Sequence, residues 1–318
     1  SYAAAALMNP SVVPHPDQSG LKPGDMRFVM SLRAVGEGHI SSIAFREGII
    51  FADGSLSLMP PPPFAMAANG IGGKRVDYDN VKCERSEHVS LSGTVIFPFT
   101  PQQRNGLEDL RLVRFQDGDE EPVYYGTYTA YSGASIASEL MVTSDFRKFS
   151  LQTMRGKASK NKGMGLFPKK IDGAYAVIGR QDNENLFFMQ SDDLRTWEDG
   201  EKILQPKYAW ERIQIGNCGA PVEIEEGWLL LTHGVGAMRQ YSIGAVLLDK
   251  KNPRKVLART PHPIVRPSDE TREGYVPNVV YTCGGLVNNN ELFMPYGVAD
   301  SSVAFCAIPL PDLLAQMI

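Results

Sequence analysis

Two adjacent acids and an arginine, in the run Glu108-Asp109-Leu110-Arg111, follow a turn-forming stretch of Pro, Gln, Asn and Gly residues. An apolar run of strand type begins directly after them, at Leu112. A carboxyl pair at the mouth of a strand, with a guanidinium two residues on, can be held rigidly and have its pKa tuned. A general acid needs these properties. The same residues also fit an ordinary turn in which a carboxylate pairs with Arg111, so the rest of the chain has to distinguish the two.

The composition is that of an ordinary globular protein, with 43% hydrophobic and 21% charged residues in a chain of 318. The net charge is −4, and the basic stretches at 160–162 and 169–170 are too sparse for a phosphate-backbone track. Nucleic acid is therefore not an expected partner. No apolar segment approaches the roughly 20 residues of a membrane span, so we expect no membrane contact and a cytoplasmic location. Ser1 is not an initiator methionine, which leaves a lost targeting signal open.

The four cysteines are far apart and form no Cys-x-x-Cys pair, and the five histidines show no metal-ligand spacing. We therefore predict no disulfide framework, no metal and no cofactor.

Strand signals follow one another along the chain, and helical periodicity is nearly absent outside 311–318 and a turn near 102–107. The stretch 52–100 contains four consecutive prolines and several glycines, so we expect a long irregular insertion there. The remaining turns are rich in Gly, Asp and Asn, which is typical of hairpins. The pattern predicts a single all-β domain over 1–318.

An internal repeat indicates the architecture. Met141–Phe149 aligns with Met189–Trp197 at an offset of 48 residues, and short Gly/Pro segments recur at 165, 219 and 275 with spacings of 54 and 56. Units of three or four strands every ~45–60 residues, without helices, are typical of a β-propeller. Five blades fit the count, and a β-sandwich is the structural alternative.

In a propeller the inner strands of all blades converge on one central funnel, so polar residues at equivalent blade positions meet in space. The candidates are Asn9, Arg33, Asp109, Arg111, Lys160, Asn161, Arg180, Gln214, His233, Tyr241, Asn278 and Asp300. Acids, cations and amides in one funnel would suit a polyhydroxylated ligand.

Several stretches in the same order make the resemblance to a known family specific. They are Gly106–Arg111, Tyr128–Tyr131, Gly165–Lys170, Gln190–Trp197, Gly227–Val235, Tyr241–Asp249, Gly274–Val280 and Pro295–Asp300. The sequence resembles glycoside hydrolase family 130, the inverting mannoside phosphorylases and mannosidases, from about residue 105 to the C-terminus. The resemblance implies a five-bladed β-propeller, in agreement with the repeat.

The resemblance also implies roles for individual residues. Asp109 would be the general acid, which protonates the glycosidic oxygen through a sugar hydroxyl. Inorganic phosphate would be the co-substrate, held by Lys160, Asn161, Arg180, His233 and Tyr241. Asn9, Arg33, Arg111 and Asp300 would bind the β-mannoside. The implied reaction is phosphorolysis to mannose 1-phosphate, and self-association of the chain stays open.

Two departures from the family pattern leave alternatives. Leu110 replaces a proline, and Gln214 stands where phosphorylases usually present a lysine or arginine. An inverting β-mannosidase would instead need a carboxylate base to activate water, and Glu184, Glu223 and Glu273 are available. A non-catalytic glycan-binding propeller is the alternative of another class. Phosphorolysis is favoured because cations outnumber any evident base.

Overall fold

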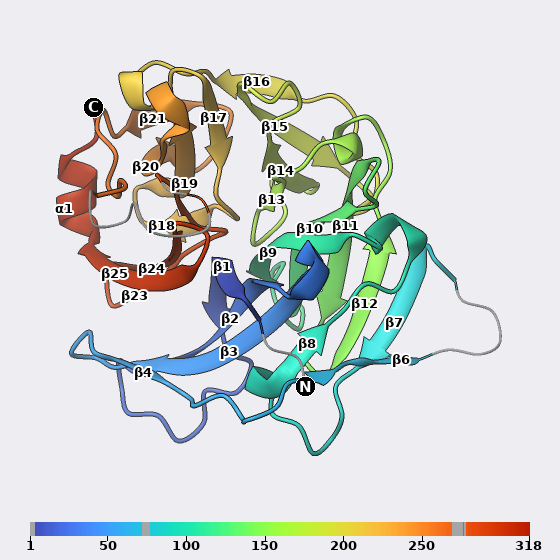
Figure 1. The fold of residues 1–318 in the computed structure, drawn as a ribbon. Coiled ribbons are helices and arrows are strands. Elements are labelled where there is room, and N and C mark those ends of the chain that lie inside the picture. Colours follow the sequence, from blue (N-terminus) through green and yellow to red (C-terminus); the bar gives the residue numbers. More distant parts are fainter. Residues whose placement is uncertain (1–3, 72–76, 269–275, 277) are drawn as a thin grey trace.

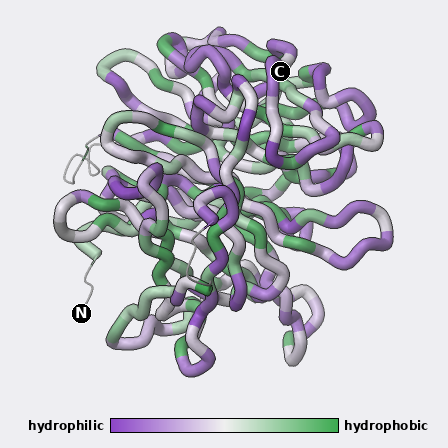
Figure 2. The backbone as a smooth tube through the Cα atoms, turned by 90° about the vertical axis from the view of Figure 1, so that its right-hand side faces the viewer, coloured by the Kyte–Doolittle hydropathy of each residue, from purple (hydrophilic) through white to green (hydrophobic). Residues whose placement is uncertain are grey.

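The computed structural model describes residues 4–71, 77–268, 276 and 278–318 (Figure 1). Strands make up nearly all of its regular structure, which confirms the all-β prediction, and within these ranges the α-helix α1 spans only Leu310–Ala315. Neighbouring strands are mostly antiparallel and joined by short turns. Hydrophobic stretches run along the strands inside the body, and hydrophilic ones lie in many of the connections at its edge (Figure 2).

The largest sheet combines two antiparallel sets of strands. Its members are β1 (Ala6–Pro14), β2 (Met26–Val35), β3 (Ser41–Ile50), β4 (Leu56–Leu58), β5 (Met66–Ala67), β6 (Asn69–Ile71), β7 (Asn80–Glu84), β8 (Thr94–Ile96), β9 (Gly106–Phe115), β10 (Val123–Tyr131), β11 (Ile136–Thr143) and β12 (Lys148–Thr153). The set β1–β4 meets the set β9–β12 through one parallel pair, Ser41 with Gly106. Gly106 has a φ of 145°, and a Cβ on it would lie 2.9 Å from that of Ser41. Glycine therefore permits this close approach.

Three smaller sheets complete the fold. The first contains β13 (Gly165–Leu166), β14 (Tyr175–Gly179), β15 (Leu186–Ser191) and β16 (Glu201–Leu204). The second contains β17 (Gln214–Asn217), β18 (Val222–Ile224), β19 (Gly227–Val235), β20 (Tyr241–Leu248) and β21 (Val256–Arg259). The third contains β22 (Val280–Tyr281), β23 (Leu286–Asn288), β24 (Glu291–Val298) and β25 (Ser302–Pro309).

The hydrophobic core is divided into clusters that each join neighbouring sets of strands. Phe45 of β3 packs in one cluster with Tyr124 of β10, and Phe188 of β15 packs in another with Trp228 of β19. A further cluster joins Phe28 of β2 to Phe293 of β24, whose ring centroids lie 5.5 Å apart. The last sheet therefore packs against the first strands of the chain, so the sets of strands surround a common centre.

The internal repeat corresponds to two equivalent turns. Asp145 Oδ1 accepts a hydrogen bond from the Arg147 amide at 2.8 Å, and Asp193 Oδ1 accepts one from the Arg195 amide at 3.0 Å. The aromatic residue that follows is buried in both copies. An aspartate that accepts a hydrogen bond from the backbone two residues on is a strong turn former, which explains why this residue recurs.

The segment 52–100 is more regular than expected. It contains β4 to β8, and β7 pairs with β12 at the edge of the large sheet. Val81 and Cys83 of β7 are 6% and 0% exposed. Alternate side chains of a strand point to the same face, so this part of the insertion contributes to the core.

Candidate active site

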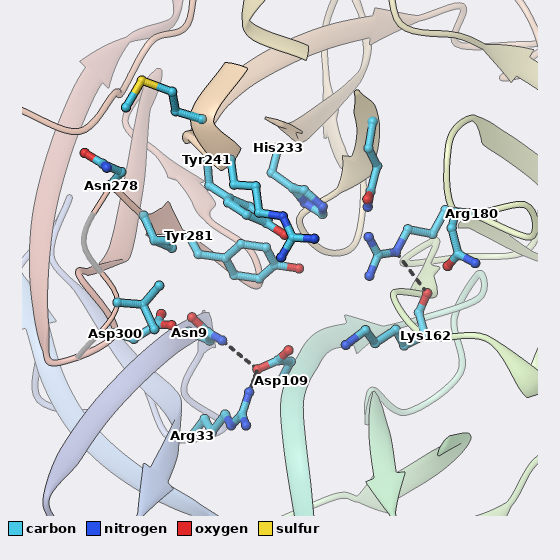
Figure 3. A pocket seen from close by; sticks show the side chains of 16 residues that line it. Asn9, Arg33, Asp109, Lys162, Arg180, His233, Tyr241, Asn278, Tyr281 and Asp300 are labelled. Carbon is cyan, nitrogen blue, oxygen red and sulfur yellow. Dashed lines mark hydrogen bonds and ion pairs between the residues drawn. The ribbon is translucent and has the colours of Figure 1, made fainter. Parts of the chain in front are cut away.

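A cavity of about 730 Å³ opens at the centre of the molecule, and every sheet contributes to it (Figure 3). Among the described residues its lining consists of Asn9, Arg33, Asp109, Lys162, Arg180, Asn183, Gln214, His233, Met238, Arg239, Tyr241, Val276, Asn278, Val279, Tyr281 and Asp300. Polar residues far apart in sequence therefore meet at one place.

A β-bulge directs Asp109 into this cavity. The register between β9 and β10 passes from Arg111–Thr127 to Glu108–Thr129, so two residues of β9 oppose one of β10. Asp109 lies in the bulge with a left-handed φ of 56°. Such bulges redirect a side chain out of the regular alternation of a strand, and here the redirected side chain is the carboxylate.

A second bulge, in β1, brings Asn9 to Asp109. The register of β1 with β2 shifts between Met8 and Ser11, and Asn9 has a φ of 50°. Its Nδ2 donates a hydrogen bond to Asp109 Oδ1 at 2.6 Å, and both residues are more than 90% buried. The two bulged strands therefore hold one carboxylate oxygen in place.

Arg33 of β2 connects the two acids of the motif. Its Nη1 lies 3.4 Å from Asp109 Oδ1, and its Nη2 lies 2.9 Å from Glu108 Oε1. Burial raises the pKa of Asp109, but the charges of Arg33 and Arg111 and the hydrogen bond from Asn9 outweigh it and lower the pKa to about 2. Asp109 is thus ionised in the free protein.

Arg111 lies behind the cavity wall and outside the lining, contrary to the expectation that it binds substrate. It is 3% exposed, and its Nη1 donates to the backbone carbonyl of Asp109 at 2.9 Å. Its Nη2 donates to the Tyr281 hydroxyl at 2.8 Å. The Arg111 side chain does not follow Asp109 into the cavity. Its hydrogen bonds hold Asp109 and Tyr281 in place, and its guanidinium provides a fixed positive charge behind them.

Two cations lie beside the carboxylate, on segments that flank strands β13 and β14 of the next sheet. Arg180 follows β14, and its Nε donates to the backbone carbonyl of Lys162 at 3.4 Å. In Figure 3 the Lys162 ammonium points into the cavity between Asp109 and Arg180. No carboxylate pairs with either side chain among the residues that the structure describes.

Lys160 and Asn161, expected at this position, are placed differently. Lys160 ends a 3-10 turn, Ala158–Lys160, and its side chain is exposed outside the cavity. The chain becomes extended at Asn161, so Lys162 reaches inward instead. Asn161 Nδ2 donates to the carbonyls of Arg180 and Gln181, at 2.8 and 3.0 Å. Asn161 therefore holds the Arg180 backbone and does not line the cavity.

An aromatic group forms the side of the cavity opposite Asp109. The His233 ring centroid lies 4.8 Å from that of Tyr281 and 6.3 Å from that of Tyr241. Gly216 makes room for the imidazole, because a Cβ there would lie 2.4 Å from its Cε1 and Nε2. Burial, reinforced by the charges of Arg180 and Arg111, holds the pKa of His233 well below its usual range.

Asp300 and Asn278 close the remaining side, Asp300 next to Asn9 and Asn278 farther from it (Figure 3). Both have left-handed backbone, with φ values of 51° and 66°. Burial and the nearby charge of Asp109 raise the pKa of Asp300, while Arg33 opposes the rise. Six polar lining residues have positive φ and concentrate backbone strain around the cavity: Asn9, Asp109, Asn183, Arg239, Asn278 and Asp300.

The loop that carries Gln214 is anchored by a buried ion pair. Glu211, which is fully buried, accepts hydrogen bonds from the amides of Lys207 and Tyr208 at 2.8 and 3.0 Å and from Arg259 Nη2. Arg259 is itself only 8% exposed. These contacts fix the turn that leads into β17, whose first residue, the uncharged Gln214, lines the cavity.

The acids considered as hydrolytic bases lie elsewhere. Glu223 pairs with Lys169 at 2.8 Å outside this cavity, and Glu184 is exposed and absent from its lining. Glu273 lies outside the described residues. No base candidate from the sequence therefore reaches the cavity among the residues with a described position.

Sequence reasoning missed several lining residues, notably Lys162, Tyr281, Asn183 and Arg239. Lys162 belongs to the basic stretch at 160–162, and because it is two residues from Lys160 it would share a face with Lys160 in an extended segment. Tyr281 lies in an apolar run typical of core strands, and Arg239 lies in a hairpin tip, so neither carried a signal. In the described part of the chain there is no cluster of three or more potential metal ligands, and no helix long and apolar enough to cross a membrane.

Known proteins resemble this chain in sequence and in structure. The family model of glycoside hydrolase family 130, described as beta-1,4-mannooligosaccharide phosphorylase, matches residues 65–317. A 1,2-beta-oligomannan phosphorylase of Thermoanaerobacter sp. (strain X514) is 34% identical over 71% of this chain and 75% of that protein. A beta-1,2-mannobiose phosphorylase of Listeria innocua serovar 6a is 33% identical over 70% of this chain and 63% of that protein.

The solved structure of a Listeria innocua beta-1,2-mannobiose phosphorylase with beta-1,2-mannobiose matches with a TM-score of 0.70. It covers 99% of this chain and 92% of that chain at 23% identity, which is a likeness of fold. The family model and the relatives above 30% identity agree with the motifs read from the sequence. The chain belongs to glycoside hydrolase family 130.

Proposed function

We propose that the protein is an inverting phosphorylase of β-mannosides that releases mannose 1-phosphate. The observation that carries the proposal is the distribution of charge in the cavity. Asp109 lies on one side with Arg33 and Asn9, while Arg180 and His233 lie on the other, with Lys162 between them (Figure 3). An inverting reaction needs a proton donor on one face of the sugar and a nucleophile on the other. Unpaired cations favour an anionic nucleophile.

The proposed reaction places the mannosyl ring between these groups. Phosphate, held by Arg180 and Lys162, attacks the anomeric carbon as the glycosidic bond breaks. Asp109 supplies a proton to the leaving oxygen through an intervening sugar hydroxyl. Arginine and lysine suit an anion because their N–H groups make charge-assisted hydrogen bonds to its oxygens. Hydrogenphosphate loses its proton as its oxygen bonds to the anomeric carbon. That proton restores the one that Asp109 gives to the released hydroxyl.

The low pKa of Asp109 in the free protein has a consequence for this sequence of events. A carboxyl group with a pKa of about 2 is almost entirely ionised at neutral pH. Bound phosphate would bring negative charge to Lys162, whose positive charge contributes to the low pKa. Phosphate would thereby raise the pKa of Asp109, which favours proton donation when the nucleophile is in place.

The proposed architecture is a five-bladed β-propeller. The sets β1–β4 and β9–β12, whose strands pair with each other at Ser41 of β3 and Gly106 of β9, would be two blades of the large sheet. The three smaller sheets would supply the other three. This division supports the proposal because the innermost strand of each set begins at, or close to, a residue that lines the cavity.

Hydrolysis is the second candidate, and Asp300 is the observation that bears on it. It is the only other carboxylate in the described lining, and it lies on the same side as Asp109 and Arg33 (Figure 3). An inverting hydrolase needs its base across the sugar from the acid. The position of Asp300 fits contact with sugar hydroxyls better. A glycan-binding protein without activity would have no use for a buried acid beside unpaired cations.

The decisive experiment is incubation with β-1,2- and β-1,4-mannobiose, with and without inorganic phosphate. The β-1,2 substrate comes first, because both relatives described above carry β-1,2 names. We expect α-mannose 1-phosphate, identified by ³¹P and ¹H NMR, only when phosphate is present. Free mannose formed equally well without phosphate would refute phosphorolysis and select hydrolysis. No reaction in either condition, while mannobiose binds by calorimetry, would select the binding protein.

A further inference from the structure

The hairpin tip between β19 and β20 has an unusual backbone. It contains the 3-10 turn η6, Ala237–Arg239, and both Met238 and Arg239 are left-handed, with φ values of 57° and 53°. The turn is closed by hydrogen bonds from the Gly236 amide to Gln240 and from the Gln240 amide to Ala237. Two successive non-glycine residues in this region are uncommon, and such strain is found preferentially at functional sites.

The tip is located at the cavity rim, on the side of the aromatic group. Met238 and Arg239 line the cavity, and Met238 is 90% exposed. Arg239 precedes Tyr241 by two residues, and the Tyr241 ring is stacked on His233. The hairpin that carries the arginine is therefore fixed to the side of the cavity opposite Asp109.

Arg239 has a neutral neighbour across the sheet. Gln214 of β17 pairs in register with Val235 of β19, directly before the hairpin tip. Both Gln214 and Arg239 line the cavity from this rim. Gln214 can make hydrogen bonds but carries no charge, so of these two lining residues Arg239 supplies the positive charge.

The charges of the described lining favour an anion with two negative charges. Arg33, Lys162, Arg180 and Arg239 are cationic, and Asp109 and Asp300 are anionic, which gives a formal charge of +2. Arg33 is engaged by Glu108 and Asp109, whereas Arg239 has no acidic partner among the described residues. Hydrogenphosphate at neutral pH carries a charge close to −2. Removing Arg239 would lower the formal charge of the described lining from +2 to +1, which compensates only half of that charge.

We propose that Arg239 is the third cation of the phosphate-binding site, and that it enters from the hairpin tip beside the neutral Gln214. This inference rests on the proposed phosphorolysis and deepens it. Lys162 and Arg180 hold the anion from one side, and Arg239 closes over it from the rim. A guanidinium at the rim lets phosphate enter and product leave without moving the buried residues.

The test is steady-state phosphorolysis of β-1,2-mannobiose by the wild type and by Arg239→Gln, with both substrates varied. We expect the KM for phosphate to rise about tenfold to a hundredfold, as the loss of one charge-assisted contact implies. The KM for mannobiose should change less than twofold. Arg239→Lys should give an intermediate value. Arg212→Gln, which removes an exposed arginine near the same rim but outside the lining, is the matched control and should behave as wild type.

A rescue variant makes the test specific. Adding Gln214→Arg to the Arg239→Gln variant returns a cation to the same rim and should lower the KM for phosphate again by at least threefold. An unchanged KM for phosphate in Arg239→Gln, or a rise confined to the KM for mannobiose, would overturn the role of Arg239. Phosphate-independent turnover of the wild type would instead refute the proposed function, so the two failures are distinguishable.

Discussion

Replacement of Asp109 by asparagine tests the electrostatics of the site directly. The amide resembles the protonated carboxyl group in shape, and asparagine tolerates the left-handed φ of 56° at this position. The carboxyl pKa falls from its ordinary 3.8 to about 2 on folding. One pKa unit corresponds to about 1.36 kcal/mol, so ionised Asp109 stabilises the fold by about 2 kcal/mol relative to a neutral group. A depressed pKa contributes stability that is fully present above pH 3.8 and is lost as the pH falls towards 2.

The assay is urea unfolding of the wild type and of Asp109→Asn at pH 7 and at pH 3. We expect the variant to be less stable by about 2 kcal/mol at pH 7, and the difference to shrink to about half at pH 3. In the same variant, kcat for phosphorolysis should fall by a factor of about 10² to 10⁴. A stability difference that does not change between the two pH values would refute the assignment of an ionised carboxylate held by Arg33 and Asn9. Undiminished kcat would refute its role as proton donor.

Three further variants test other parts of the structure. Lys162→Ala should raise the KM for phosphate by about tenfold or more, whereas Lys160→Ala, two residues away and exposed, should leave it within twofold of wild type; the reverse order would contradict the placement of the two lysines. Tyr281→Phe removes the acceptor of a buried guanidinium and should lower the free energy of unfolding by about 1–3 kcal/mol, and urea denaturation with an unchanged midpoint would show that this hydrogen bond is dispensable. Arg259→Met leaves the Glu211 carboxylate buried without its partner and should cost about 3–5 kcal/mol of stability, a loss that calorimetry would register as a lower Tm, while an unchanged Tm would argue against a buried ion pair.

Much of the fold followed from features that depend on local sequence. The spacing of strands and turns reflects the two-residue alternation of strands and the turn chemistry of Gly, Asp and Asn. The repeat centred on Asp145 and Asp193 reflects a backbone hydrogen bond that each copy makes within its own turn. Such features can be read from the sequence because their causes lie within a few residues. The family resemblance rested on the same short stretches.

The misplaced site residues depended on backbone details that the sequence pattern does not contain. Lys160 and Lys162 would share one face of an extended segment. Because the 3-10 turn ends at Lys160, Lys162 is the one that faces the cavity. Arg111 was expected to contact substrate, but the bulge at Asp109 separates the two side chains. Arg239 comes to the site through a strained hairpin tip. In each case a single change of backbone direction determines where a charge is placed.

The bulges of β1 and β9 also divide each strand into two parts, one that packs in the core and one that directs side chains into the cavity. Beyond the bulge, residues such as Leu112 keep the alternation that the core requires. Before and within it, the direction of Asn9 and Asp109 is set by the bulge and by their mutual hydrogen bond. Side chains before the bulge can therefore be substituted without shifting the register of the core residues. Deleting one bulged residue would instead turn every preceding side chain of that strand to the opposite face. Libraries for altered specificity in this protein should accordingly preserve the length of both bulges.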